Sequence, residues 1–450
     1  MQPPRKPGSI AGVSLMTATA VTVANMIGTG VFTSLGFQVV DIQSGFSLLL
    51  VWILGGVFAL CGALSYGELA AAMPRSGGEY HFLGRIYHPA VGFLSGWISL
   101  TVGFAAPIAL AAMAFGRYAG RVADGLSPLP VSCAVVVLVT LAHLRDLRLG
   151  SAFQNLFTVF KVVLILVFIG ASFGVSNPRP IRFAPQAADL DIIQGAPFAI
   201  ALLFVMYSYS GWNASTYIMD EVRDAAATVP RSLILGTVLV TALYVGLNWS
   251  FLAVTPADEL DKLAAAEAEV SHVVAASIFG DAGGRLMSAM LCVALVSSIS
   301  AMTWAGPRVT QVMGQDLAAF RYLAGTGAAG IPRRAILLQS AIVVVLLVTA
   351  TFEQVLVYIQ LTLTLSLFLT VLGVFVLRWR RPDLPRPYKT WGYPVTPLLF
   401  LAIGLFTLGY TLATRPAESL AGLATVLVGL PIYLLSPKIR DEDGRPGPTG

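Results

Sequence analysis

The sequence predicts an all-α polytopic membrane protein with about 12 transmembrane helices, and three observations support this fold class. Of the 450 residues, 56% are hydrophobic and only 11% are charged, whereas an ordinary soluble domain is about a quarter charged. The apolar residues fall in runs of the roughly 20 residues that a helix needs to span a bilayer. Most Lys and Arg residues lie between those runs. A folded protein in water has to present polar surface, so a soluble globular enzyme is nearly excluded.

Twelve apolar segments follow one another along the chain. We expect transmembrane helices at 12–35, 46–72, 90–118, 130–147, 153–175, 194–220, 232–254, 285–306, 335–352, 355–379, 393–413 and 419–436. The connections leave no room for a sizeable soluble domain, so residues 1–437 are expected to form a single transmembrane domain, followed by a tail at 438–450. The longest connection, 255–284, opens with an N-cap threonine, a proline and then an acid, which predicts a short surface helix.

The Lys and Arg residues are distributed unevenly between the two sides of the predicted membrane. Of the 28, the connections on the N-terminal side hold 20 and the opposite connections hold seven, with one lysine left inside a segment. Cytoplasmic loops of membrane proteins carry an excess of Lys and Arg. Both termini are therefore expected in the cytoplasm, with the protein in the plasma or inner membrane of the cell.

Several other classes of protein find no support in the sequence. The basic residues form no patch interleaved with aromatic side chains, so no nucleic acid partner is expected. Cys61, Cys133 and Cys292 lie far apart inside apolar segments, without disulfide or metal spacing. The four histidines form no HExxH motif, and no P-loop occurs. We therefore expect no metal, no cofactor and no enzymatic activity, with a membrane-embedded enzyme as the remote alternative.

The first segment is interrupted near its middle. Residues 26–30 read Met26, Ile27, Gly28, Thr29 and Gly30, and each glycine costs a helix about 1 kcal/mol relative to alanine. Non-helical backbone at this depth persists only where it is buried in protein or lines a cavity. Small residues also allow tight packing between membrane helices, so this pattern alone leaves both interpretations open.

The sixth segment has a similar interruption at a matching position. It gathers small and polar residues in the run Tyr207, Ser208, Tyr209, Ser210, Gly211, Trp212 and Asn213. If segments one to five (about 12–175) repeat as six to ten (about 194–379), with peripheral helices at 393–436, the two interruptions correspond. Paired interruptions in two repeats are the best sequence pointer to a transporter's binding site.

Two interrupted helices offer complementary charges to a ligand. A half-helix that begins at Thr29 and Gly30 presents N–H groups and a positive dipole end to a carboxylate. Half-helices that end near Ile27 and near Ser210 present carbonyl oxygens to an ammonium group. A zwitterion suits both ends, so the expected ligand is a small-molecule amino acid.

Several motifs together resemble the amino acid–polyamine–organocation transporter family. They are the residues 27–32, 66–69, 74–80, 93–97 and 386–389, and the stretch 209–231 is similar to the sixth helix of the L-type amino acid transporter branch. The resemblance covers nearly the whole chain. It implies a LeuT-type five-plus-five inverted repeat with two extra helices, and secondary-active transport by alternating access.

The resemblance also implies roles for individual residues. The backbone of Gly28, Thr29 and Gly30 would bind the substrate carboxylate. Carbonyls of Met26, Ile27, Tyr207 and Ser210 would bind its amino group, and Tyr207, Tyr209 and Trp212 would form aromatic walls or gates. The predicted substrate-binding set is completed by Ser208, Gly211 and Asn213.

Ser210 bears on substrate selectivity. Some L-type relatives that accept basic substrates carry an acid at this position, and no Asp or Glu lies in the middle of any predicted span. A second positive charge would be costly to bury without a partner. We therefore expect neutral L-amino acids. The alternative is a sodium-coupled or a cationic amino acid or polyamine transporter.

Lys161 is the one lysine inside a predicted span. A lysine near a span end can extend its side chain to the membrane surface, and spacing alone leaves this reading open. The resemblance implies instead that its ammonium takes the place of a sodium ion, against first-helix carbonyls and the hydroxyls of Ser297 and Ser298. A desolvated lysine can exchange a proton. Proton symport and amino acid exchange both remain open, as do the oligomeric state and any accessory subunit beside the membrane lipid.

Overall fold

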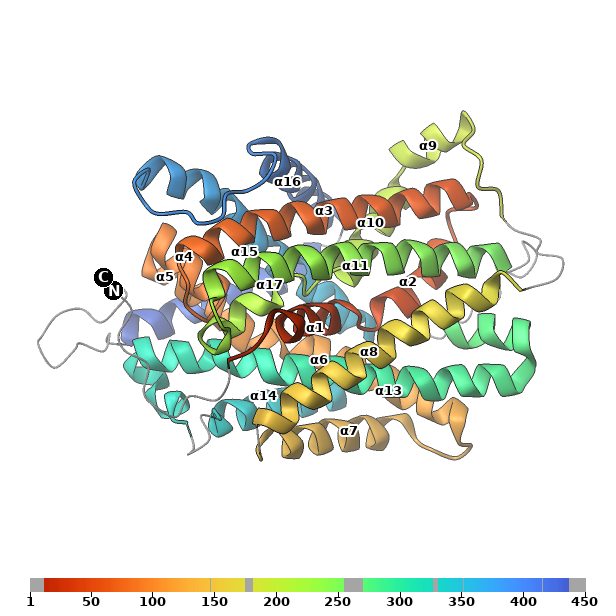
Figure 1. The fold of residues 1–450 in the computed structure, drawn as a ribbon, viewed down its shortest axis with the longest axis horizontal. Coiled ribbons are helices and arrows are strands. Elements are labelled where there is room, and N and C mark those ends of the chain that lie inside the picture. Colours follow the sequence, from red (N-terminus) through yellow and green to blue (C-terminus); the bar gives the residue numbers. More distant parts are fainter. Residues whose placement is uncertain are drawn as a thin grey trace, which may run out of the picture.

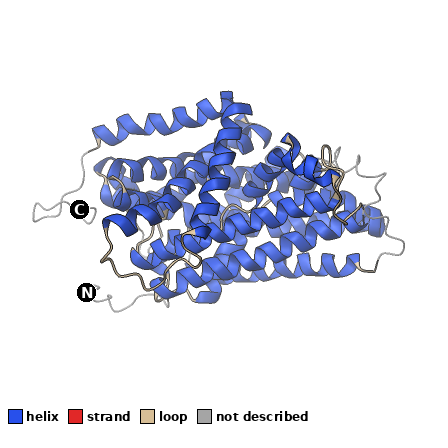
Figure 2. Cartoon of the chain, turned by 90° about the horizontal axis from the view of Figure 1, so that it is seen from above, coloured by secondary structure: helices blue, strands red, loops and turns tan. Residues whose placement is uncertain are grey.

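The computed structural model describes residues 12–145, 147–174, 181–254, 270–326, 331–350, 352–414 and 416–436. These residues are almost entirely helical and form no β-strand; one isolated β-bridge joins Val13 to Val222. Most of the helices run roughly along the longest axis and pack side by side in an elongated bundle (Figures 1 and 2). The predicted all-α fold class is confirmed.

Each of the 12 predicted segments coincides with one helix or with two or three successive helical elements. The helical elements are, in chain order, α1 (Leu15–Met26), α2 (Gly30–Gln38), α3 (Gly45–Ala72), α4 (Glu79–Ile86), α5 (Pro89–Ile98), the π-helix η1 (Ser99–Gly103), α6 (Ala105–Val122), α7 (Pro128–His143), α8 (Leu147–Ser172), α9 (Ala188–Gln194), α10 (Ala196–Ser208), the 3₁₀-helix η2 (Ala214–Glu221), α11 (Ala225–Val254), α13 (Val270–Asp316), the 3₁₀-helix η5 (Ala318–Ala324), α14 (Arg333–Thr349), α15 (Phe352–Arg380), α16 (Val395–Thr414) and α17 (Pro416–Leu435).

The lengths of these elements support a multi-pass membrane protein. In the described part of the chain, eight helices are long and apolar enough to cross a membrane, and a ninth span results if the bent pair α9–α10 counts as one. The remaining predicted segments correspond to α7, α14 and α17. α7 and α14 have 16 and 17 residues, fewer than the 18 of a full span, and α17 has 20 residues.

The described helices depart from the predicted boundaries in two places. The predicted segment 285–306 is part of the 47-residue α13, which extends beyond it at both ends and kinks at Gly280. A surface helix is expected within the connection 255–284. The first half of this connection, 255–269, lies outside the described residues, and the second half, 270–284, belongs to α13. The predicted tail at 438–450 also lies outside the described residues.

The outer surface of the bundle is apolar. Leu138 on α7, Leu156 on α8 and Leu427 on α17 are 66%, 67% and 62% exposed. Apolar side chains exposed to this extent on several outer helices would be unfavourable in water and are expected in contact with lipid tails. This surface therefore agrees with a chain that is embedded in a membrane.

Short elements identify the two ends of the bundle. α4 lies at one end, which we call the α4 end, and α9 lies at the other, the α9 end (Figure 1). At the α9 end, Asp189 accepts a hydrogen bond of 2.6 Å from Ser44, the N-cap residue of α3. It also pairs with Arg182 at 2.9 Å. These contacts fix α9 against the start of α3.

Candidate functional site

The first membrane helix is broken where the sequence predicts a break. α1 ends at Met26 and α2 begins at Gly30, and the backbone between them leaves the helical conformation at Ile27, with φ −76° and ψ 79°. Thr29 provides no side-chain cap to α2, so the first N–H groups of α2 are available to an anionic ligand. A Cβ atom at Gly28 would meet nothing within 4 Å. Open space therefore adjoins this break.

The sixth predicted span is broken as well. α10 ends at Ser208, and the chain continues through a turn to the 3₁₀-helix η2. Gly211 lies in this turn with φ +95°, a conformation that glycine adopts without strain. The predicted interruption at residues 207–213 is thus a change of backbone conformation.

The two breaks are in direct contact through glycines. A Cβ atom at Gly30 would lie 2.4 Å from the Ser208 hydroxyl oxygen, and one at Gly211 would lie 2.8 Å from the carbonyl group of Asn25. Any larger side chain at either glycine would have to move the opposite segment. The small residues at both breaks therefore have two roles: they interrupt the helices, and they allow the two segments to pack closely.

Tyr244, a residue that sequence reasoning missed, joins both breaks. Its hydroxyl on α11 lies 2.6 Å from the carbonyl oxygen of Met26 and 3.1 Å from that of Ser208. These are the last residues of α1 and α10. Tyr244 is fully buried. No local signal distinguishes it from the other tyrosines, since its role depends on the packing of α11.

Lys161 on α8 also binds the first break. Its Nζ atom lies 2.6 Å from the Ile27 carbonyl oxygen, 3.4 Å from that of Ala24 and 2.8 Å from the Ser298 hydroxyl on α13. Ser298 donates a second hydrogen bond of 2.7 Å to Ile27. Lys161 thus lies against first-helix carbonyls and Ser298, and its role in coupling stays a prediction. Ser297 is fully buried, as is Lys161, whose side chain does not reach the surface.

Two of the carbonyl groups predicted to bind the substrate ammonium already accept other hydrogen bonds. The Met26 carbonyl accepts hydrogen bonds from Tyr244 and from the Gly28 N–H, and the Ile27 carbonyl accepts from Lys161 and Ser298. Each oxygen thus already has two partners, as many as it has lone pairs. An amino group that bound here would share or displace them.

A cavity of about 70 Å³ adjoins the second break. Ser210, Gly211 and Asn213 line it from the break, together with Asn25 of α1 and Glu79 of α4. Residues of α5, η1, α6, η2, α13 and α15 complete the walls. The cavity is large enough to hold water and lies directly beside the exposed backbone of the unwound segment.

The predicted aromatic residues lie elsewhere. Tyr209 packs against Trp52 and Tyr244, and its hydroxyl donates to the Trp52 carbonyl at 3.0 Å. Trp212 packs edge-on against Tyr66, with ring centroids 4.7 Å apart. Tyr207 is buried on α10. None of Tyr207, Tyr209 and Trp212 is among the residues that line the 70 Å³ cavity.

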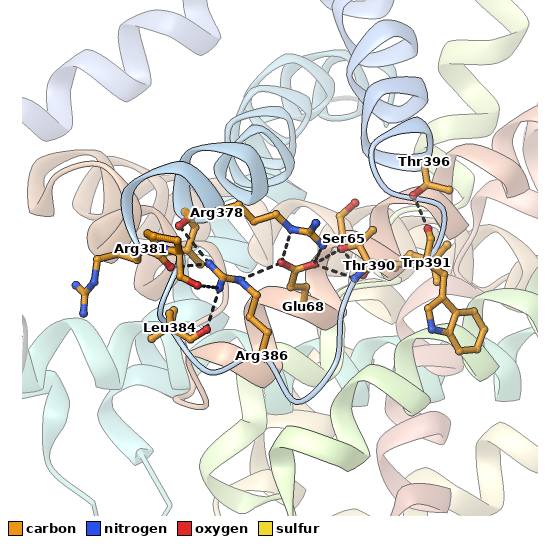
Figure 3. Close-up of polar contacts among 12 residues, drawn as sticks. Ser65, Glu68, Arg378, Arg381, Leu384, Arg386, Thr390, Trp391 and Thr396 are labelled. Atoms are coloured by element: carbon orange, nitrogen blue, oxygen red, sulfur yellow. Dashed lines mark hydrogen bonds and ion pairs between the residues drawn. The ribbon is translucent and has the colours of Figure 1, made fainter.

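Glu68 forms a buried ionic cluster at the α4 end of the bundle (Figure 3). Its carboxylate accepts two hydrogen bonds from Arg378 on α15, at 2.8 and 2.6 Å. Arg386 lies 3.3 Å away, and both the N–H and the hydroxyl of Thr390 donate at 2.8 Å. The cluster joins α3, α15 and the connection to α16.

The chain is similar to known proteins over nearly its whole length. The sequence model of the amino acid permease family matches residues 13–430 of this chain. The chain is 28% identical to the large neutral amino acids transporter small subunit 2 of Mus musculus over 446 residues, covering 94% of this chain and 80% of the relative. It is 26% identical over 427 residues to the serine/threonine exchanger SteT of Bacillus subtilis, covering 94% and 95%. It is 27% identical over 441 residues to the human b(0,+)-type amino acid transporter 1, covering 94% and 87%.

Proposed function

Because the chain belongs to the amino acid permease family and is an amino acid transporter of the membrane, we propose that it carries neutral L-amino acids by alternating access around its two helix breaks. One observation carries this proposal: the breaks contact each other, Gly30 against Ser208 and Gly211 against Asn25. Exposed peptide groups of both helices thus meet at one place. We propose that the chain transports amino acids and catalyses no reaction.

The break in the first helix supports a carboxylate site. The start of α2 at Gly30 has no side-chain cap, and Gly28 faces open space. The N–H groups of Thr29 and Gly30 and the positive end of the helix dipole would bind the substrate carboxylate. The Gly28 N–H would join them when it releases the Met26 carbonyl. The amino group would bind carbonyl oxygens at the facing break, Tyr207 and Ser210, and those of Met26 and Ile27 when their present partners move.

Ser210 supports the preference for neutral substrates. It lines the 70 Å³ cavity without bringing a charge to it. The carboxylate of Glu79 also lines this cavity, but it already accepts hydrogen bonds from Tyr66 and Asn213. A substrate with a second positive charge would have to displace these donors, and burying that charge without a free partner is costly.

Lys161 supports coupling to protons or amino acid exchange rather than to sodium. Its ammonium occupies a set of three oxygen acceptors, from Ala24, Ile27 and Ser298, which could otherwise bind a monovalent cation. We propose that the hydrogen bonds of Lys161 stabilise the first break. Loss of its proton, or binding of the substrate, would weaken these hydrogen bonds. We further propose that the α4 end faces the cytoplasm, because Lys and Arg residues are enriched there.

Uptake into proteoliposomes tests the proposal. Labelled L-leucine, L-serine and L-arginine are offered while the pH gradient, the sodium gradient and the internal amino acid are varied separately. We expect uptake of the neutral substrates and little uptake of arginine. Acceleration by internal substrate alone would establish exchange, and dependence on an inward proton gradient would establish symport. Uptake that required sodium, or that favoured arginine, would contradict the proposal.

A further inference from the structure

Glu79 is a buried acid, and the conformation of the loop before it places its side chain inside the bundle. It is the first residue of α4 and is 3% exposed. Gly77 and Gly78 precede it with φ values of +113° and +52°. A Cβ atom at Gly78 would lie 2.4 Å from the ring of Tyr217 on η2. Two glycines therefore allow this loop to approach the broken sixth helix closely.

Neutral groups surround the Glu79 carboxylate. The Tyr66 hydroxyl donates to its Oε1 atom at 2.8 Å, and the Asn213 amide donates to the same oxygen. Tyr217 accepts a hydrogen bond of 2.8 Å from the Asn213 amide. These partners come from α3, from the second break and from η2.

The other buried acids of the described chain have a different environment. Glu68, Asp189 and Asp316 pair with Arg378, Arg182 and Arg75, respectively, at 2.6 to 2.9 Å. A guanidinium partner keeps a carboxylate charged. The partners of Glu79 described above carry no charge, and burial raises the pKa of Glu79 above its ordinary value.

Glu79 shares a cavity with the second break. The same 70 Å³ space is lined by Glu79, Asn213 and Tyr217 and by Ser210 and Gly211 of the unwound segment. This space can hold water, which can carry a proton to the carboxylate.

The charged and titratable neighbours of Glu79 are few. Tyr66 from α3 and Tyr217 from η2 face it, and phenols ordinarily titrate near pH 10. On α4 itself, Tyr80 and His81 line a separate cavity. The charged residues of that separate cavity are Arg75, Arg85 and Asp316. Glu79 is therefore the group in its own cluster that can change charge between acidic and neutral pH.

We propose that Glu79 is a proton-binding site of the transport cycle, which takes up a proton from the cavity beside the second helix break and thereby loosens its hold on Asn213. An O–H bond forms on the carboxylate as one in a cavity hydronium ion breaks, and no electron is transferred. An ionised carboxylate accepts hydrogen bonds at both oxygens, and these charge-assisted bonds weaken when it becomes neutral. Protonation would thus free the unwound segment from α3 and α4. The inference rests on the proposed transport function.

The first test compares pH profiles of amino acid exchange, with the same pH on both sides of the proteoliposome membrane. We expect the wild-type rate to change by about tenfold or more between about pH 5 and pH 8, as the ionised fraction of one group can. Glu79→Gln, which resembles the protonated acid, should give a flat profile. Asp41→Asn removes an exposed acid and should leave the profile unchanged. A wild-type profile in Glu79→Gln would overturn the proposal.

A second variant addresses the risk that Glu79→Gln does not fold. The hydrogen bond of 2.8 Å from Tyr66 lowers the pKa of Glu79, so Tyr66→Phe should move the pH profile toward higher pH. Loss of packing alone would lower the rate at every pH without moving the profile. A profile that stayed in place, or moved to lower pH, would contradict a proton on Glu79.

Infrared spectroscopy separates this inference from transport itself. In a pH titration of the purified wild-type protein in lipid, we expect a protonated-carboxyl band at acidic pH that disappears on raising the pH and is missing in Glu79→Gln. If the wild type carries no amino acid but shows this band, the proposed function fails and the proton site stands. If it carries amino acids and no such band titrates, the proton site fails alone.

Discussion

The ammonium nitrogen of Lys161 lies 2.6 Å from the carbonyl oxygen of Ile27, the residue at which the first membrane helix unwinds. The two residues are 134 positions apart in the sequence. A charged side chain of the fifth predicted span thus stabilises the non-helical backbone of the first. Any movement of α1 during transport has to break or carry along this hydrogen bond.

Replacement of Lys161 by alanine tests this link. Lys161→Ala removes the donor to Ala24 and Ile27 and leaves Ser298 as the remaining partner of Ile27. If the chain is a proton symporter, this variant should lose proton coupling while it still binds substrate. Uptake driven by an imposed pH gradient measures the effect. The exposed Lys389 provides the control Lys389→Ala, and wild-type coupling in Lys161→Ala would remove the lysine from the mechanism.

The two glycines of the first break should respond differently to a methyl group. Gly30→Ala would place Cβ 2.4 Å from the Ser208 hydroxyl oxygen and 2.7 Å from its Cα. We expect a loss of about 1–3 kcal/mol in unfolding free energy, typical of overpacking, together with loss of transport. Gly28→Ala meets nothing within 4 Å. It should leave thermal stability unchanged and weaken substrate binding, because its methyl group enters the proposed carboxylate site.

Thermal unfolding in lipid nanodiscs and substrate binding to both variants provide the comparison. Equal stability of Gly28→Ala and Gly30→Ala would contradict the close contact between the two breaks. Unchanged substrate affinity in Gly28→Ala would argue against the carboxylate site at this position.

Tyr244→Phe should destabilise both breaks at once. It removes the hydroxyl that contacts the carbonyl oxygens of Met26 and Ser208 and leaves buried acceptors without that donor. The expected cost is about 1–3 kcal/mol of unfolding free energy, with a reduced rate of transport. Tyr322, which is 68% exposed, gives the control Tyr322→Phe. A Tyr244→Phe variant as stable and as active as this control would show that the contact is dispensable.

Disruption of the Glu68 cluster should uncouple α3 from α15 at the α4 end (Figure 3). Arg378→Ala leaves the carboxylate of Glu68, which is 1% exposed, with Arg386 and Thr390 as partners. Since removing one member of a buried ion pair is strongly unfavourable, we expect a loss of about 2–4 kcal/mol, measured as reduced resistance to thermal unfolding.

The exposed pair Arg285–Asp124, 3.8 Å apart, is the matched control for this ionic cluster. Arg285→Ala should cost less than about 1 kcal/mol. Similar losses in Arg378→Ala and Arg285→Ala would mean that burial adds nothing to the Glu68 cluster.

Because His81 is buried, we expect the unfolding free energy of the protein to fall at acidic pH. Burial, followed by the nearby Arg75 and Arg85, lowers the pKa of His81 to about 3. The unfolded chain binds a proton at its ordinary pKa near 6.5, so the folded state loses stability as the pH falls from about 6.5 toward 3. His81→Gln should reduce this loss. Unfolding measured as a function of pH checks it, and an identical pH dependence in wild type and variant would refute the assignment.

Much of the fold and part of the site could be predicted from local sequence. Apolar run length placed all 12 segments, because a helix in lipid must be long and apolar. Glycines marked the breaks at residues 27–29 and 209–213, since they weaken a helix wherever it packs. The family motifs also placed Lys161 against the first helix and Ser298.

Only the tertiary structure decided which groups meet at the site. Tyr244 reaches the breaks from α11, and Glu79 enters the bundle from a polar loop that hydropathy assigns to the surface. Tyr209 and Trp212 belong to the packing between helices rather than to the cavity. The length and apolarity of a segment, and the residues that interrupt its helix, depend on neighbouring residues in the chain, so the sequence determines them directly. Contacts between residues more than a hundred positions apart depend on how the helices pack, and no local pattern encodes that.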